Sequence, residues 1–358
     1  MVNLDDVKEV VNLQGGDSVI TSINSIDKQL AQAWKETHEM QIPQEFRDVK
    51  RILFCGMGGS RFPAIIVKEL FKETLNVSIE IQDDYTPPAW AKEDTLVILS
   101  SYSGTTEEVV MCGKAAYELG ARKFLGLTSG GDVASWLKEK EFPVYVFDPI
   151  HNPSRQPRIG LGYTIGGLLG FLWNLKFLDV DKKDIEGAIS AIPALLSSFK
   201  LDVESSKNPA KLLAQKIHQH YPYFIVSEFL IGAGNAIQNQ TNETAKSISS
   251  YRVISELNHH LMEGLKFPKT HADIALFIFF YSGLYSERIQ KRFKITKEVV
   301  EKNNIKTHWH ELQGKNKAEQ LFELLGFGGY VSMYLSALYE QDPTAIPYVD
   351  YFKEQLKK

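Results

Sequence analysis

Short apolar segments alternate with helix-length segments along most of this chain. In the first half the strand-like runs are apolar throughout and span 52–55, 77–81, 96–99, 123–128 and 144–147. Helical patterns at 63–71, 107–119 and 133–140 separate most of these runs. Strands that are apolar on both faces and alternate with helices are typical of a parallel sheet covered by helices on each side.

The same alternation returns after a polar, helical stretch at 179–210, which is a candidate linker. We expect strands at 223–226, 253–256, 275–281 and 306–311, helices at 233–249, 259–265, 286–302 and 315–339, and a tail helix at 349–356. The length of 358 residues suits two ordinary domains rather than one. The sequence therefore predicts an α/β protein of two domains, 1–200 and 201–358, each a three-layer sandwich with a mostly parallel sheet flanked by helices.

Two further helical patterns lie outside this alternation. The segment 17–47 has an amphipathic face, and either Asp17 or Ser18 is positioned to cap its start. The segment 161–175 is rich in glycine and apolar nearly all round. Such a helix is expected to be buried in the protein interior.

Composition excludes several classes of protein. The net charge of −4 gives no electrostatic reason to expect nucleic acid as a partner. Cys55 and Cys112 are the only cysteines, so we expect a cytoplasmic protein without a disulfide framework. The polar, acidic start of the chain predicts no signal peptide. The longest apolar run, 274–280, is too short to cross a bilayer and is expected to be a buried strand, so no membrane partner is predicted.

Two loops rich in glycine and hydroxyl side chains follow predicted strands and precede predicted helices. They are Gly-Met-Gly-Gly-Ser at 56–60 and Ser-Tyr-Ser-Gly-Thr-Thr at 101–106. Because the carboxyl ends of parallel strands meet at one edge of the sheet, the loops are expected to form one anion site there. Neither loop contains lysine, so neutral donors and helix N-termini would hold a phosphate. The candidate phosphate-binding residues are Gly58, Gly59, Ser60, Ser101, Ser103 and Thr106.

The alternative for each loop is that its hydroxyls only cap the following helix, since serine and threonine favour such positions. Two similar loops on parallel strands make phosphate binding the better interpretation. The first loop lacks the third glycine of a dinucleotide-binding fingerprint, and neither loop has the Gly-Lys-Ser/Thr of a Walker motif.

These loops resemble those of the sugar isomerase (SIS) domain, which binds phosphosugars. Further motifs resemble the bifunctional phosphoglucose/phosphomannose isomerase family over nearly the whole chain: Pro-Arg-x-x-x-Gly-Tyr at 157–163, Asn-Glu at 242–243, Glu-Leu-Asn-His at 256–259 and Asp-x-x-Lys at 350–353. The resemblance implies two tandem SIS domains in a homodimer with shared active sites. It also implies a phosphosugar substrate and a reaction that needs no cofactor and no metal.

The resemblance also implies a role for each of four side chains in an aldose–ketose isomerisation through a cis-enediol. Glu243 would move the proton between C1 and C2, and Arg158 would stabilise the enediolate. His259 and Lys353 would open the sugar ring, with His259 supplied by the partner subunit. Without the resemblance, each residue has a simpler interpretation. Glu243 would be a solvated glutamate on a helix, His259 a histidine at a helix start, and Lys353 a lysine on the surface. His308 and His310 share one strand face, but two ligands without a third are weak evidence for a metal.

The chain departs from the family pattern at three places. His260 and Leu261 follow His259 where the family has Asn-Glu, and Thr105 replaces an asparagine in the second loop. Seven residues before Lys353, the family often has a hydroxyl associated with mannose 6-phosphate, whereas this chain has Ile346, with Thr344 nearby. The expected reaction is therefore the interconversion of glucose 6-phosphate and fructose 6-phosphate, with mannose 6-phosphate as a second candidate substrate. The alternative is a non-catalytic phosphosugar-binding SIS regulatory protein.

Overall fold

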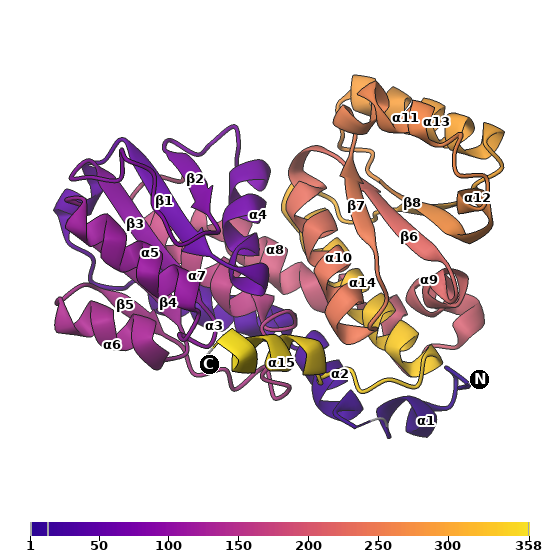
Figure 1. Cartoon of the computed structure of the whole chain (residues 1–358), viewed down its shortest axis with the longest axis horizontal. Coiled ribbons are helices and arrows are strands. Elements are labelled where there is room, and N and C mark those ends of the chain that lie inside the picture. The colour runs from indigo at the N-terminus through magenta and orange to yellow at the C-terminus, as the bar shows by residue number, and fades with distance from the viewer. Residues whose placement is uncertain (1, 13, 357) are drawn as a thin grey trace.

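The first sheet lies in the left half of the computed structural model (Figure 1), which describes residues 2–12, 14–356 and 358. Its strands pair in parallel in the order β2-β1-β3-β4-β5. They are β1 (Arg51–Gly56), β2 (Ser78–Gln82), β3 (Thr95–Ser101), β4 (Lys123–Thr128) and β5 (Val144–Val146). The predicted parallel sheet is thus confirmed, with every strand within a few residues of its expected position.

Helices cover both faces of this sheet because successive strand residues point to opposite sides. Leu53, Val97 and Phe124 pack with α5 (Glu107–Glu118) and α6 (Gly131–Glu139). Their sequence neighbours, such as Phe54 and Ile98, face the other core. That core contains α3 (Ile26–His38), α4 (Phe62–Leu70) and α7 (Leu161–Asn174). The predicted three-layer arrangement follows from this alternation of buried residues.

The second sheet repeats the strand order of the first. Its strands β6 (Tyr221–Val226), β7 (Ser250–Val253), β8 (Ala275–Tyr281) and β9 (Lys306–Glu311) are parallel in the order β7-β6-β8-β9. Phe280 faces α14 (Lys317–Leu338) through Phe327, with α9 (Pro209–Ile217) and α10 (Ile231–Thr244) in the same layer. Phe279 faces α13 (Glu287–Lys302). The predicted duplication of an α/β unit is therefore visible in the topology.

The remaining elements connect or flank the two sheets. The helices are α1 (Val7–Val11), α2 (Gly16–Ile23), α8 (Lys182–Leu195), α11 (Leu261–Gly264), α12 (His271–Ile274) and α15 (Pro347–Leu356). Short 3-10 turns are η1 (Gln44–Arg47), η2 (Gly58–Ser60), η3 (Ser197–Phe199), η4 (Ser205–Lys207), η5 (Glu228–Leu230) and η6 (Glu256–His259). The tail helix α15 lies in the lower middle of the view in Figure 1.

Several local expectations need correction. The helix expected at 17–47 is interrupted after Ile23, and α2 begins at Gly16 after a left-handed Gly15, so neither Asp17 nor Ser18 is its N-cap. The candidate linker contains α8 and the start of α9. Glu256 lies in a 3-10 turn rather than in a strand.

The N-terminal helices extend to the second unit. Helices α1 and α2 pack against α14 of the second unit, and Asp5 pairs with buried Lys211 at 3.1 Å.

Among the described residues, α14 alone is long and apolar enough to cross a membrane, and that stretch is entirely buried inside the protein. The division at residue 200 remains a prediction.

A stripe of glycines on α7 allows α3 to approach at backbone distance. A Cβ atom added to Gly162 would lie 2.9 Å from the carbonyl oxygen of Ile26, and one added to Gly166 would lie 2.7 Å from that of Leu30. The third member, Gly170, faces the backbone of His38 at 2.8 Å. Spacing of four residues places all three on one face of the helix, so no other residue fits there without moving α3.

We predict that Gly166→Ala destabilises the protein by about 2 kcal/mol or more, because the added methyl group meets backbone atoms that cannot move aside. The matched control is Gly187→Ala on α8, where an added Cβ meets nothing within 4 Å. That change should stabilise the helix by roughly 0.5–1 kcal/mol. Denaturant unfolding of both variants provides the comparison, and equal midpoints would contradict the packing argument.

Candidate functional site

The two hydroxyl-rich loops lie side by side at the carboxyl edge of the first sheet. Strands β1 and β3 are neighbours, with Gly56 opposite Ser100. The backbone N–H of Tyr102 donates a hydrogen bond of 2.8 Å to Ser60 Oγ, which joins the two loops directly. Gly58 adopts a left-handed conformation with φ of 48°, and a Cβ added there would meet open space. The predicted meeting of the loops is therefore observed.

The second loop is shaped by its own hydroxyl groups. Ser101 Oγ shares a hydrogen bond of 2.7 Å with Thr106 Oγ1 and accepts one of 3.0 Å from the Gly104 N–H. Gly104 has φ of 75°, and an added Cβ would overlap a backbone carbonyl oxygen, so glycine is required there. Ser103 is exposed and bonds to Thr105 at 3.1 Å. Thr106 makes no side-chain cap for α5, so an anion could accept from the first N–H groups of that helix.

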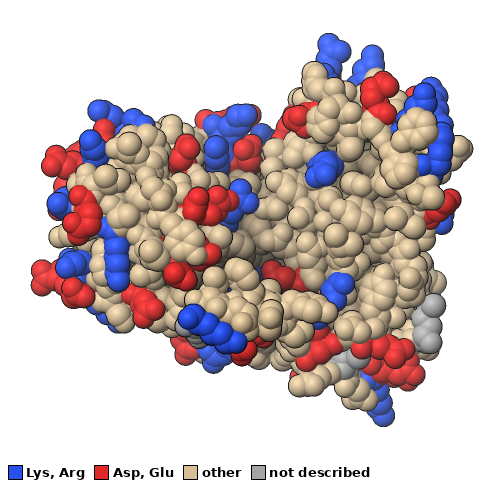
Figure 2. All heavy atoms as spheres, in the orientation of Figure 1, with Lys and Arg blue, Asp and Glu red and all other residues tan. Residues whose placement is uncertain are grey.

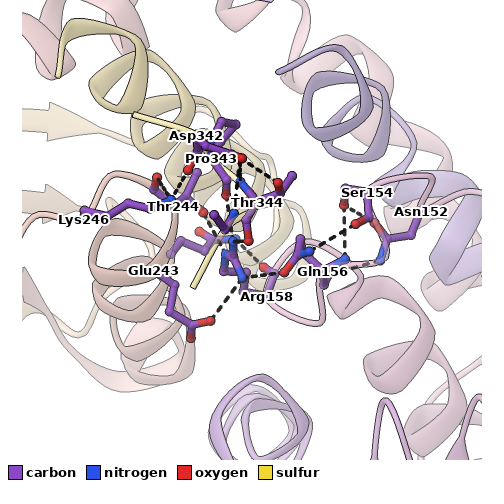
Figure 3. A network of polar contacts seen from close by, with 12 residues as sticks. Asn152, Ser154, Gln156, Arg158, Glu243, Thr244, Lys246, Asp342, Pro343 and Thr344 are labelled. Carbon is purple, nitrogen blue, oxygen red and sulfur yellow. Dashed lines mark hydrogen bonds and ion pairs between the residues drawn. The ribbon is translucent and has the colours of Figure 1, made fainter. Parts of the chain in front are cut away.

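A chain of polar contacts leads from these loops to Arg158, and Figure 3 shows the part of it that runs from Asn152 through Gln156 to Arg158. The Tyr102 hydroxyl accepts from Asn152 Nδ2 at 2.7 Å, and the same amide donates to the Gln156 carbonyl at 3.1 Å. Gly59 also lies against this segment, since an added Cβ would be 3.2 Å from the Pro157 carbonyl carbon. The two loops and Arg158 are thus joined by one continuous set of contacts.

Arg158 is buried, with 1% of its surface exposed, and all five of its guanidinium N–H groups have partners. Nε donates to Thr244 Oγ1 at 3.0 Å, and Nη1 donates to Gln156 Oε1 at 2.8 Å and Glu243 Oε2 at 3.2 Å. Nη2 donates to the carbonyl oxygens of Pro343 at 2.7 Å and Thr344 at 3.2 Å. Desolvation lowers the pKa of Arg158, and the nearby Glu243 carboxylate opposes that shift. The full set of partners offsets the cost of burying the charge.

Helix α10 supplies three of the groups around Arg158 from one face. Gln240 Nε2 donates to the Arg158 carbonyl at 3.1 Å, and Glu243 and Thr244 follow one turn later. Spacing of three and four residues is what brings side chains together on a helix. Of this group, Glu243 has 33% of its side chain exposed. Its carboxylate can therefore reach a ligand while remaining paired with Arg158.

The other two predicted catalytic residues do not join this cluster within one chain. His259 is exposed in η6, beyond the carboxyl end of β7, whereas Glu243 lies at the far end of α10. A helix of that length spans about 20 Å, so the two residues lie at opposite ends of the second unit. Lys353 is exposed on α15 and makes no hydrogen bond or ion pair among the described residues. The structure thus brings together Arg158 and Glu243 only.

Several members of the cluster could not have been recognised from sequence. Gln156 and Thr244 carry no motif of their own, although they lie within two residues of Arg158 and Glu243. Pro343 and Thr344 contribute backbone carbonyl groups, which every residue has, so the residue types at these positions do not indicate the contact. The one local signal in the sequence is the Asp-Pro pair at 342–343, which is typical of a turn after a helix.

The two histidines of β9 are held by neighbouring groups. Burial lowers the pKa of His308 to about 4 and that of His310 to about 3, so both are neutral at pH 7. His308 Nδ1 accepts from Lys216 Nζ at 3.1 Å, and the His310 ring stacks on Phe327. In the part of the chain that the structure describes, no group of three or more metal-ligating side chains is found.

The corresponding edge of the second sheet already holds a carboxylate. Glu228 begins the turn after β6 with φ of 44°, in the place where Gly58 begins the turn after β1. Its carboxylate accepts from Ser286 Oγ at 2.7 Å and from the Ser286 N–H at 3.3 Å. Ser286 precedes α13 as Thr106 precedes α5, with four residues between strand and cap in both loops. An anion from solution would have to displace this side chain.

We predict that Arg158→Gln destabilises the fold by about 3–5 kcal/mol, because the buried carbonyl oxygens of Pro343 and Thr344 lose their donors. Arg155→Gln is the matched control, since Arg155 is exposed and three residues away. Its effect should remain within about 0.5 kcal/mol. Thermal unfolding measures both, and a similar loss in the two variants would show that the Arg158 contacts are not formed.

Comparisons with known proteins agree with this architecture. Residues 206–356 match the family described as the bacterial phospho-glucose isomerase C-terminal SIS domain. The chain is 27% identical over 339 residues to the bifunctional phosphoglucose/phosphomannose isomerase of Caldicellulosiruptor bescii, covering 94% of this chain and 98% of that protein. It is 27% identical over 318 residues to the Aquifex aeolicus protein of the same name, covering 88% and 93%.

A solved structure shows the same fold. The crystal structure of a hypothetical protein from Thermus thermophilus superposes with a TM-score of 0.75 at 12% identity, covering 99% of this chain and 94% of that one. With two parallel sheets of one strand order, the chain is similar over nearly its full length to proteins named bifunctional phosphoglucose/phosphomannose isomerase, and its residues 206–356 match the SIS domain of that kind of enzyme.

Proposed function

We propose that this protein is an aldose–ketose isomerase that interconverts glucose 6-phosphate and fructose 6-phosphate in the cytoplasm. The observation that carries the proposal is the Arg158–Glu243 pair, joined by hydrogen bonds to an anion-binding edge. One part of such a site can hold a phosphate while another part moves a proton, which is what the isomerisation requires.

The phosphate binds to the loops of the first domain. Ser60, Ser101, Ser103 and Thr106 offer hydroxyl groups, and Gly58 and Gly59 let the backbone approach the ligand. The N-terminus of α5 adds further N–H donors. The second domain does not take part in phosphate binding because Glu228 fills the equivalent place.

Glu243 moves the proton between C1 and C2 of the open-chain sugar. When it accepts the proton its negative charge passes to the substrate as an enediolate, so the total charge beside Arg158 does not change. The Nη1 hydrogen bond to the carboxylate can then be exchanged for one to the enediolate oxygen. Arg158 therefore stays paired with one negative charge before and after the proton transfer. The N–H group released by Glu243 serves the enediolate, so the other four hydrogen bonds of Arg158 can remain.

Ring opening requires His259 and Lys353, as the family resemblance implies. Since His259 lies at the opposite end of the second domain from Glu243, we propose that each site of a homodimer receives His259 from the partner subunit. Mannose 6-phosphate is the weaker substrate in this account. Ile346 stands where the family often has the hydroxyl residue associated with mannose 6-phosphate. The nearby Thr344 hydroxyl already donates a hydrogen bond of 2.6 Å to the Asp342 carboxylate.

The base assignment predicts that Glu243→Gln lowers kcat by about a thousandfold or more, because a neutral amide cannot accept the C2 proton. The assay couples formation of fructose 6-phosphate to a dehydrogenase. Glu298→Gln, on the exposed surface of α13, is the matched control and should remain fully active. Turnover by Glu243→Gln within tenfold of wild type would exclude Glu243 as the base.

The shared-site arrangement predicts complementation between two inactive variants. Mixed subunits of Glu243→Gln and His259→Ala form heterodimers in which one site keeps both residues, so activity should recover to about a quarter of wild type. Each variant alone provides the baseline. If the mixture shows only the sum of the two separate activities after subunit exchange, His259 does not act across the dimer.

A further inference from the structure

Lys246 is a second cation beside Arg158 that no motif singled out. It follows the end of α10 with φ of 54°, a position and conformation in which glycine is usual. Its ammonium group donates to the Thr244 carbonyl at 3.2 Å and to the Asp342 carbonyl. Thr244 thus lies between the two cations, because its hydroxyl accepts from Arg158. Figure 3 shows Lys246 and Arg158 converging on the same segment.

Three successive carbonyl groups of the segment 342–344 face these two cations. Lys246 binds the carbonyl of Asp342, and Arg158 binds those of Pro343 and Thr344. The other side of the turn is closed by the Asp342 carboxylate, which accepts from the N–H groups of Thr344 at 2.7 Å and Ala345 at 3.2 Å. The turn at 342–345 is therefore fixed from both sides.

The helix that follows this turn has little else to hold it. None of the residues of α15 is buried, and Tyr348 is 89% exposed. Figure 2 shows this face of the molecule hollowed between the two domains, above α15. The direction in which α15 leaves the body, and with it the position of Lys353, thus depends on the turn at 342–345.

We propose that Lys246 is a positioning residue of the isomerase, which together with Arg158 clamps the turn at 342–345 and so sets where Lys353 lies. This inference rests on the proposed function for its catalytic consequence, but the clamp itself does not. A merely structural lysine at the end of α10 would stabilise the helix without affecting the turn or the turnover.

The charges around Lys246 make the clamp sensitive to pH. Desolvation and the nearby Arg158 lower the pKa of Lys246 to about 8, while Asp342 and Glu243 oppose the shift. Lys246 therefore loses its charge as the pH rises through about 8, and the clamp weakens on the alkaline side. Activity that depends on the clamp should fall there.

The test compares Lys246→Met with Lys246→Arg, which keeps a permanent charge, and with Lys291→Met, an exposed lysine on α13. Hydrogen exchange of the Thr344 and Ala345 amides should increase about tenfold or more in Lys246→Met only. At about pH 7.5, kcat should fall about tenfold or more in the same variant. The alkaline decline near pH 8 should be absent from Lys246→Met and shifted upward in Lys246→Arg. Lys246→Gln replaces Lys246→Met if the latter fails to fold.

Unchanged exchange at 344 and 345 in a folded neutral variant would overturn the clamp. Faster exchange with unchanged kcat and pH profile would overturn the positioning role in catalysis. A wild-type protein that does not turn over glucose 6-phosphate would instead refute the proposed function, and the exchange measurement would still decide whether Lys246 holds the turn.

Discussion

The hydrogen bonds of the buried Arg158 guanidinium hold the candidate site together. A charge removed from water must have all its hydrogen bonds satisfied, and Arg158 obtains its partners from three separate parts of the chain. These are the loop before α7, the end of α10 and the turn after α14. The loop belongs to the first unit and the other two segments to the second, so this one side chain ties the units together.

The two units have the same topology but differ at the carboxyl edge of the sheet. Both sheets have the same strand order, and both place a residue with positive φ after their first strand. In the first unit this residue is Gly58, which leaves the strand ends open to an anion. In the second it is Glu228, which fills that edge with a carboxylate. In the proposed function, the first unit therefore holds the phosphate and the second contributes Glu243 from the other end of α10.

The features that follow from local pattern could be predicted from sequence. The central strands β3 and β8, which are buried on both faces, lie where their apolar runs predicted them, whereas the half-buried edge strand β7 spans Ser250–Val253 and overlaps the expected strand at 253–256 only at Val253. The meeting of Ser60 with the second loop followed from the geometry of parallel strands. The break after Ile23 and the packing of α1 and α2 on α14 were missed, because tertiary contacts rather than periodicity determine them.

The contacts of the candidate site were less predictable for the same reason. The resemblance named Arg158 and Glu243, and the structure joins them, but their shared partners include backbone carbonyl groups that any residue could supply. The separation of His259 from Glu243 depends on the direction and length of α10. The spacing of residues 243 and 259 in the sequence does not reveal this separation, which is seen only in the structure.

A crystal structure of the protein with 5-phosphoarabinonate, a mimic of the enediolate, would show whether the two loops and the Arg158–Glu243 pair bind one ligand. We expect the phosphate to lie against Ser101 and Thr106, at the N-terminus of α5, with the carboxylate end of the ligand between Arg158 and Glu243. Phosphate density at the second sheet, in place of the Glu228 carboxylate beside Ser286, would contradict it.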